Sequence, residues 1–187
     1  GTYASACIGK WHLSVNANGG AENPGKMGFS HYSGHLSGAL KDYFSWDKTT
    51  DGEATTSTKW APSQNVDDAL AWLGSDKRGD KPFLLWVAFN APHSPFHEPP
   101  AALHSVTDLP KNVPKKPVKH YRAMIEAMDT EIGRLFDGIG QEQLAKTYVI
   151  FVGDNGTPGA VVQHPVEKKK SKGTLYQGGV AVPLAMI

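Results

Sequence analysis

The sequence predicts an α/β fold in which a mostly parallel or mixed central sheet is flanked by helices. Residues 82–90 and 147–152 are apolar runs of strand length, and residues 119–139 between them carry the best helical pattern. Apolar strands that alternate with helices are typical of a sheet covered on both faces. The chain has 187 residues, of which 40% are hydrophobic, and this is enough for one domain with a substantial core.

Weaker patterns precede these elements. Residues 2–13 predict a strand that runs into a loop. Residues 16–28 are rich in Gly, Asn and Pro and predict irregular structure. We expect a packed surface loop over residues 28–34 and a short strand over residues 41–47, just before a polar turn.

Regular elements are easier to recognise in the remainder of the chain. Residues 66–73 have the apolar spacing of a short helix, and Asn65 is its expected N-cap. The longer helix over residues 119–139 has one apolar stripe, formed by Tyr121, Ile125, Met128, Ile132, Leu135 and Phe136. The strand over residues 147–152 leads directly to Asp154.

The composition excludes several classes of partner. A formal net charge of +1 gives no reason to expect nucleic acid or a membrane surface. No apolar run approaches the roughly 20 residues of a membrane helix, and no signal peptide is visible. The single cysteine, Cys7, has apolar neighbours, so we interpret it as a small buried residue rather than a nucleophile.

Several polar residues stand at or just past the carboxyl ends of the predicted strands, where α/β sheets bind ligands. They are Lys10, His12, His93, Asp154 and Asn155. If the first strand extends through residue 12, Lys10 and His12 project to the same side of it. An ammonium and an imidazole at one point suit an anionic substrate, because the first binds charge and the second moves a proton.

Two further motifs add to this predicted site. Asp154 and Asn155 offer hard oxygen donors that suit Ca²⁺ or Mg²⁺, although two donors fall short of six and an ordinary Asp-Asn-Gly turn is the alternative. Lys172 belongs to a basic run, and it differs from its neighbours because Gly173, Gly178 and Gly179 let the backbone pack closely around it.

Four motifs in this order resemble the sulfatase family of the alkaline-phosphatase superfamily. Residues 9–13 read Gly-Lys-Trp-His-Leu, and residues 81–95 hold an apolar strand followed by Ala-Pro-His-Ser-Pro. Residues 121–135 are similar to the family's helix before an Asp-Asn-Gly turn, and residues 172–183 are similar to its Lys-Gly-Thr segment. The resemblance implies an alkaline-phosphatase-like fold over nearly the whole chain.

The resemblance also implies roles for individual residues. Lys10 and Lys172 correspond to the sulfate-binding cations, His12 to a partner of the nucleophile, and His93 to the donor to the departing ester oxygen. Asp154 and Asn155 correspond to metal ligands, usually of Ca²⁺ and otherwise of Mg²⁺. The implied activity is sulfuric ester hydrolysis.

Two features of the family are not found in this sequence. It has no Asp-Asp pair on a first strand, and no Cys-x-Pro-x-Arg or Ser-x-Pro-x-Arg segment whose first residue becomes formylglycine. We therefore expect residues 1–187 to form part of a single sulfatase catalytic domain, as a fragment that lacks the N-terminal metal and nucleophile segment and the C-terminal region. The complete enzyme is expected to hydrolyse sulfate esters, and this chain alone is expected to be inactive.

Two alternative functions stay open. One is a phosphonate or phosphodiester hydrolase of the same superfamily, and the other is a non-catalytic remnant that binds sulfate or a sulfated glycan. The expected partner is a sulfate ester, either a small molecule or a glycan, with no nucleic acid and no membrane. Exposed sheet edges predict self-association. The resemblance implies an exported, periplasmic or lysosomal location.

Overall fold

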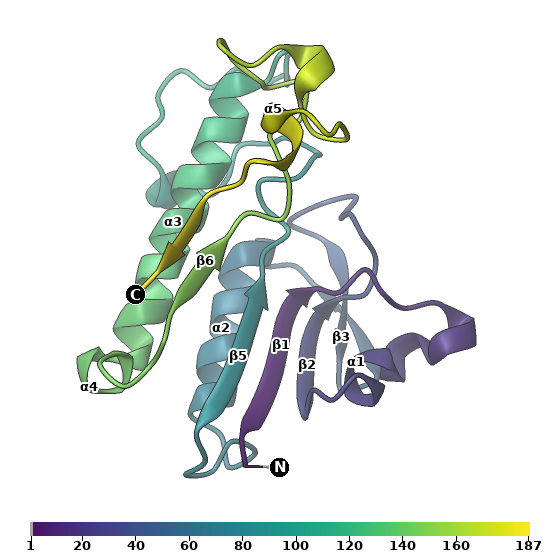
Figure 1. Ribbon diagram of the computed structural model, residues 1–187, viewed down its shortest axis with the longest axis vertical. Helices are drawn as coiled ribbons and strands as arrows, with labels where there is room; N and C mark the ends of the chain where they lie inside the picture. Colours follow the sequence, from purple (N-terminus) through teal and green to yellow (C-terminus); the bar gives the residue numbers. More distant parts are fainter. Residues whose placement is uncertain (1) are drawn as a thin grey trace.

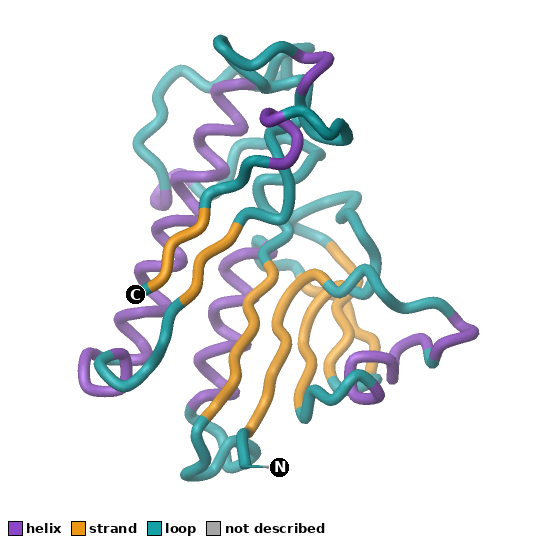
Figure 2. Tube along the Cα trace, viewed as in Figure 1, coloured by secondary structure: helices purple, strands orange, loops and turns teal. Residues whose placement is uncertain are grey.

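A mixed sheet of five strands lies at the centre of the molecule, in the order β4-β3-β2-β1-β5 (Figures 1 and 2). The computed structural model describes residues 2–187. β1 pairs in parallel with both β2 and β5, whereas β2, β3 and β4 pair antiparallel. The strands are β1 (Ala4–Lys10), β2 (His31–His35), β3 (Trp46–Thr50), β4 (Glu53–Ser57), β5 (Phe83–Ala88), β6 (Ile150–Val152) and β7 (Leu184–Met186).

The two long helices lie on one face of this sheet (Figure 1). The two long ones are α2 (Ala61–Leu73) and α3 (Val118–Ile139), which pack against each other. The short ones are α1 (Asn23–Lys26), α4 (Gln141–Leu144) and α5 (Gln177–Val180), with 3-10 turns η1 (Asn16–Asn18), η2 (Gly20–Glu22), η3 (Ala101–Leu103) and η4 (Lys168–Lys170). The predicted α/β class, with a mixed central sheet flanked by helices, is confirmed.

Alternation along β1 determines which of its side chains meet the helices. Ala4, Ala6 and Ile8 are buried against a cluster that includes Val66 and Trp72 of α2. Because successive side chains of a strand point to opposite faces, Cys7 lies on the other face. There it packs with Trp11 and Tyr32, and all three are buried. Burial raises the pKa of the Cys7 thiol to about 12, which confirms a buried, unreactive cysteine.

The longer helix was predicted well, because it has a sustained apolar stripe. α3 covers the predicted range within one residue at its N-terminal end. α2 begins at Ala61, five residues before the predicted start, with Pro62 in its first turn. The prediction that Asn65 is an N-cap is wrong, since Asn65 lies inside α2 and is fully buried.

The prediction of a surface loop over residues 28–34 is also wrong. His31–His35 form β2, a strand between β1 and β3. Its polar side chains are buried because neighbours satisfy them: the Ser33 hydroxyl donates to the Asp68 carboxylate at 2.8 Å, and His31 Nδ1 lies 2.9 Å from the Asp51 carboxylate. Residues 16–28, expected to be irregular, form the short turns η1, η2 and α1.

β6 and β7 form a separate antiparallel pair. Figure 1 shows β6 beside β5 and pointing in the same direction, and the two are not hydrogen-bonded neighbours in one sheet. Ile150, Phe151 and Val152 are all exposed, and the side chains of β5 alternate between exposed and half-buried. The expectation that both apolar strands are covered on both faces is therefore wrong within residues 2–187.

The helices of residues 2–187 include none that combines the length and apolar character of a membrane-spanning segment.

Candidate functional site

Two of the predicted site residues follow neighbouring parallel strands. Lys10 is the last residue of β1, and His93 lies five residues beyond the end of β5. Gly9 and Ala88 are paired in the register of these strands. The carboxyl ends of parallel strands meet at one edge of the sheet, so Lys10 and His93 share that edge. Asp154 follows β6, whose arrow points to the same end of the molecule (Figure 1).

The backbone at Gly9 explains why glycine precedes Lys10. A Cβ added at Gly9 would lie 2.1 Å from the carbonyl oxygen of Ala88, and the φ of Gly9 is +104°. On the other side, a Cβ added at Gly34 would lie 1.9 Å from the carbonyl oxygen of Gly9. The three strands β2, β1 and β5 therefore approach closely at this level, just below Lys10.

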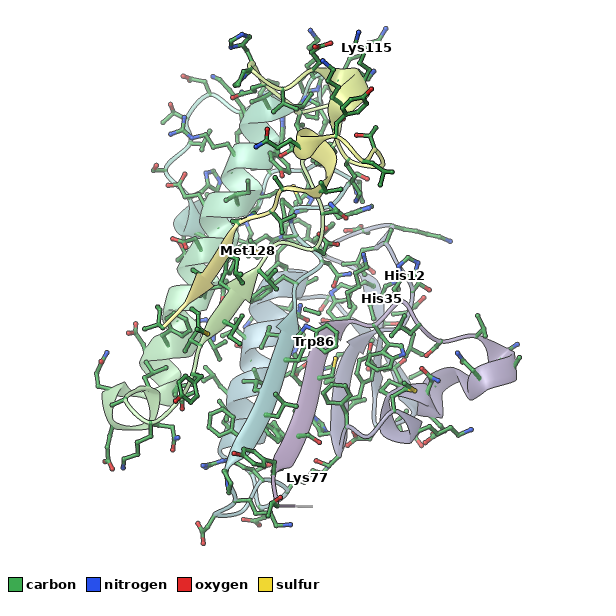
Figure 3. The ribbon with its side chains drawn as sticks, viewed as in Figure 1. His12, His35, Lys77, Trp86, Lys115 and Met128 are labelled. Atoms are coloured by element: carbon green, nitrogen blue, oxygen red, sulfur yellow. The ribbon has the colours of Figure 1, made fainter. Side chains whose placement is uncertain are left out.

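His12 is positioned by a loop rather than by the strand. β1 ends at Lys10, and His12 has a φ of 63°, so the strand alternation that was predicted to align it with Lys10 does not extend to it. The His12 backbone N–H donates to the Leu36 carbonyl at 3.0 Å, and a Cβ at Gly38 would lie 2.2 Å from His12 Nε2. His12 and His35 lie at this end of the sheet (Figure 3). A left-handed backbone in a non-glycine residue stores strain, and such strain is concentrated at functional sites.

His93 is held through both its backbone and its ring. The single O–H of Tyr43 is shared between the carbonyl oxygens of Asn90 and His93, each 2.8 Å from the hydroxyl oxygen. His93 Nδ1 lies 2.8 Å from the Ser94 carbonyl oxygen, so Nδ1 carries the proton in the neutral ring. Nε2 can then donate a proton only from the imidazolium form. This is the form that a proton donor to a leaving oxygen needs.

The Asp-Asn-Gly turn and the glycine-rich segment after Lys172 are in backbone contact. The Gly156 N–H donates to the Gly179 carbonyl at 2.9 Å, and a Cβ at Gly156 would lie 2.0 Å from the Gly178 carbonyl oxygen. The Lys172 N–H donates to the Thr157 carbonyl at 3.0 Å. The two motifs are therefore one packed unit, and their glycines permit the close approach.

The same unit shows the predicted close packing near Lys172. A Cβ at Gly179 would lie 2.1 Å from the Thr174 carbonyl oxygen, and a Cβ at Gly178 would lie 2.6 Å from that of Lys170. Gly173 serves differently, because its φ is +88° and a Cβ there would meet nothing within 4 Å. It supplies backbone conformation rather than space.

The metal-ligand prediction can be tested against the donors that are present. Asn155 Nδ2 donates to the Gly156 carbonyl at 3.0 Å, which leaves Asn155 Oδ1 available as a ligand beside the Asp154 carboxylate. These oxygens fit a hard cation in type. They do not fit it in number, since within residues 2–187 no three His, Cys, Asp or Glu side chains come together to hold a metal.

His97 is a structural residue. Its Nδ1 lies 2.9 Å from the Pro95 carbonyl oxygen, and its Nε2 accepts a hydrogen bond from the Trp60 indole at 2.8 Å. The ring packs against Tyr43, with centroids 4.4 Å apart. Burial lowers the pKa of His97, because removal from water disfavours the charged ring.

Three residues at this edge of the sheet have contacts that their local sequence does not predict. Tyr43 lies in the segment predicted as a short strand over residues 41–47, and its role depends on the distant His93. Asn65 and Asn90 are buried, and their side-chain oxygens and nitrogens have no hydrogen-bond partner among residues 2–187. Asn65 was predicted only as a helix N-cap, and nothing in the local sequence distinguishes Asn90.

Two hollows lie over β2 and contain none of the six predicted residues. One, of about 310 Å³, is lined by residues that include Glu22, Tyr32 and Asp51. The other, of about 250 Å³, is lined by residues that include Lys48 and Asp68. None of the predicted residues lines either hollow, and their convergence into one site stays a prediction.

Comparison with known proteins gives one consistent family. The sulfatase family model matches residues 2–187. An uncharacterized sulfatase of Escherichia coli, YdeN, is 26% identical over 209 residues, which cover 98% of this chain and 36% of the relative. An endo-4-O-sulfatase of Bacteroides thetaiotaomicron is 26% identical over 193 residues, covering 82% of this chain and 38% of the relative. The chain thus spans well under half the length of these relatives.

Solved structures show the same fold. A 4-S-sulfatase structure from a study of glycosaminoglycan metabolism in Bacteroides thetaiotaomicron has a TM-score of 0.73 at 20% identity, covering 99% of this chain and 45% of that one. A second solved structure is of a protein in complex with its substrate, D-glucosamine-2-N,6-O-disulfate. It has a TM-score of 0.69 at 18% identity, and the match covers 98% of this chain and 52% of that one. With the family model matched over residues 2–187, this chain belongs to the sulfatase family.

Proposed function

We propose that the complete enzyme containing this chain hydrolyses sulfate esters, and that this chain supplies half of its catalytic centre. The observation that carries the proposal is the placement of Lys10 and His93 at the ends of two neighbouring parallel strands. A cation and a proton donor at one edge suit a substrate that is anionic and loses an alkoxide or phenoxide. The family match over residues 2–187 supports the same chemistry.

Each site residue has a proposed task. Lys10 and Lys172 bind the peripheral oxygens of the sulfate, where negative charge is spread as the sulfuryl group is transferred. His12 assists the nucleophile, and His93 protonates the departing oxygen from Nε2 while Nδ1 stays bound to the Ser94 carbonyl. Tyr43 acts through His93 and is a positioning residue.

Asp154 and Asn155 are the proposed metal ligands of this chain. Their oxygens would hold Ca²⁺, or Mg²⁺ as the alternative, and the ion would stabilise negative charge on the sulfate when bound. Asn155 Nδ2 is already engaged by the Gly156 carbonyl, so Oδ1 is oriented before any ion arrives. With two donors in residues 154–155, we expect weak binding by this chain alone.

The proposal is tested in the longer polypeptide that contains this chain, with an aryl sulfate as substrate. Lys10→Ala and His93→Ala should each lower kcat/KM by at least about a hundredfold, and chelation should lower it reversibly. Lys146→Ala is the control, since this exposed lysine lies two residues beyond the end of α4 and pairs with Glu142. Turnover that survives both variants and chelation would refute the proposal.

The same assay separates the superfamily alternatives. A sulfatase should prefer an aryl sulfate over an aryl phosphodiester or phosphonate, and a reversed preference would identify the alternative hydrolase. A non-catalytic remnant would bind sulfate or a sulfated glycan without turnover and without a need for metal. No feature of residues 2–187 favours either alternative.

The single-domain assignment, the exported, periplasmic or lysosomal location and self-association stay predictions. Self-association has a physical basis in β5, an edge strand of the five-stranded sheet on which Leu84 and Trp86 are exposed. Sedimentation of the chain across a range of concentrations tests it. A mass that stays monomeric at every concentration would argue against it.

A further inference from the structure

The positive charge of this chain is concentrated in two segments. Residues 111–119 and 167–172 contain eight lysines and one glutamate, so they carry a formal charge of +7. The whole chain has a formal charge of +1, and the remaining residues are therefore acidic overall. We call the lysines of these segments outside the catalytic site the lysine surface: Lys111, Lys115, Lys116, Lys119, Lys168, Lys169 and Lys170.

Most of this charge is not neutralised within the protein. The Glu167 carboxylate is the acidic partner in these segments, and it pairs with Lys170 at 2.7 Å and with Lys169 at 3.3 Å. Hydrogen bonds from those lysines lower the pKa of Glu167. Within residues 2–187, no carboxylate lies within 4.0 Å of the ammonium nitrogen of Lys115, Lys116 or Lys168, and all three lysines are exposed.

The two segments meet next to the candidate site. Burial raises the pKa of Tyr121, in the first turn of α3, and the nearby side chains of Thr157 and Asp154 also act on it. The Thr157 carbonyl in turn accepts the Lys172 N–H. Lys115, just before α3, lies at the same end of the molecule as η4 (Figure 3). The lysine surface therefore borders Asp154 and Lys172.

Exposed apolar side chains lie just beyond the second of these segments. Leu175 is 94% exposed and Tyr176 is 59% exposed, three and four residues beyond Lys172. The Lys170 ammonium lies 5.8 Å from the centre of the Tyr176 ring. An aromatic face beside ammonium groups can contact the apolar face of a sugar ring while the lysines contact its anionic substituents.

We propose that the lysine surface binds additional sulfate groups of a multiply sulfated glycan while one sulfate of the same chain occupies the site at Lys172 and Asp154. This inference rests on the proposed function and narrows its substrate class. A monosulfated small molecule carries one charge, which Lys10 and Lys172 already match. A row of unpaired lysines is complementary only to a polyanion that extends beyond the reacting sulfate.

The test measures binding of a heparin hexasaccharide to the chain by titration calorimetry at several salt concentrations. The triple variant Lys115→Gln, Lys116→Gln, Lys168→Gln removes three unpaired charges and no proposed catalytic residue. We expect the triple variant to weaken binding about tenfold or more. We also expect the slope of log Kd against the logarithm of the salt concentration to fall by about 2. Thermal unfolding of each variant checks that the fold is retained.

The matched control is Lys26→Gln, Lys81→Gln, Lys146→Gln, which removes the same charge at exposed positions away from the lysine surface. Equal binding by the two triple variants would overturn the inference. An oligothymidylate of equal charge is the second control. If it binds as tightly as the hexasaccharide, and if the Lys115, Lys116, Lys168 triple variant weakens its binding as much, the inference is also overturned, because the surface would then be a general polyanion site.

The two proposals fail separately. Hexasaccharide binding is measured without turnover. If the complete enzyme hydrolyses an aryl sulfate but the two triple variants bind the hexasaccharide equally well, only this inference is refuted. Binding that depends on the lysine surface in a polypeptide with no sulfatase activity would refute the proposed function, and with it the assignment of these lysines to a substrate.

Discussion

The Tyr43 hydroxyl lies 2.8 Å from the carbonyl oxygen of His93 and donates a hydrogen bond to it, across 50 positions of sequence. The same O–H is shared with the carbonyl of Asn90, also at 2.8 Å. One side chain therefore closes the turn that carries the proposed proton donor.

Replacement of this hydroxyl leaves two backbone acceptors without their donor. Tyr43→Phe should lower the free energy of unfolding by about 1–3 kcal/mol, because Tyr43 is 2% exposed and water cannot substitute freely. Urea denaturation measures the change. Tyr3→Phe, at a tyrosine that is 62% exposed, is the control and should leave stability unchanged. A fully stable Tyr43→Phe protein would show that the hydroxyl contributes nothing to the turn.

Gly9→Ala tests the close approach of β1 and β5. The added Cβ would lie 2.1 Å from the Ala88 carbonyl oxygen in a residue whose φ is +104°, so clash and backbone strain act together. We expect a loss of about 3 kcal/mol or more, or no folded protein. Gly133→Ala is the contrasting variant. It lies in α3 where a Cβ meets nothing within 4 Å, and it should gain about 0.5–1 kcal/mol. Similar effects at both positions would contradict the strand geometry.

The pH dependence of stability should contain a contribution from His97. Burial lowers the pKa of this ring in the folded state below its ordinary value of 6.5, so the unfolded chain binds the proton more readily. The contribution of neutral His97 to the free energy of unfolding is fully present above about pH 6.5. It is lost as the pH falls from there towards the pKa of His97 in the folded protein. Free energies of unfolding between pH 8 and pH 5 measure it. His97→Gln should be less stable at pH 8 and should flatten the acid side of the profile, whereas an unchanged slope would exclude His97 as its source.

The ion pair between Glu131 and Arg134, both on α3, should be worth more to stability than a surface pair. Glu131 is 3% exposed, accepts a hydrogen bond from Ser63 at 2.6 Å and pairs with Arg134 at 2.6 Å. Arg134→Met should cost about 2 kcal/mol, because it leaves a buried carboxylate without its cation, although the exposed guanidinium moderates the loss. Adding Glu131→Gln should restore part of it.

The exposed pair Lys146–Glu142 provides the comparison, since its side chains are 67% and 91% exposed. Lys146→Met should change the free energy of unfolding by less than about 0.5 kcal/mol. If Arg134→Met costs no more than Lys146→Met, or if adding Glu131→Gln makes the protein still less stable, the pairing argument is wrong.

The sequence alone determined the α/β class, α3 and β5, because these depend on patterns within one segment. A helix of 22 residues repeats its apolar stripe many times, and a short apolar run followed by Pro92 has few alternatives to a strand. The four ordered motifs were equally local, and they were enough to identify the family that the comparison with known proteins confirmed.

Only the tertiary structure decided which distant groups satisfy one another. β2 was not recognisable from its own residues. Its buried Ser33 is tolerated because the Asp68 carboxylate, on α2, accepts a hydrogen bond from the Ser33 hydroxyl. The contact of Gly156 with Gly178 and the hydrogen bond of Tyr43 to His93 follow the same principle. Burial of a polar group or a close backbone approach is stable only when its partner is in place, and the chain order of the residues does not reveal that partner.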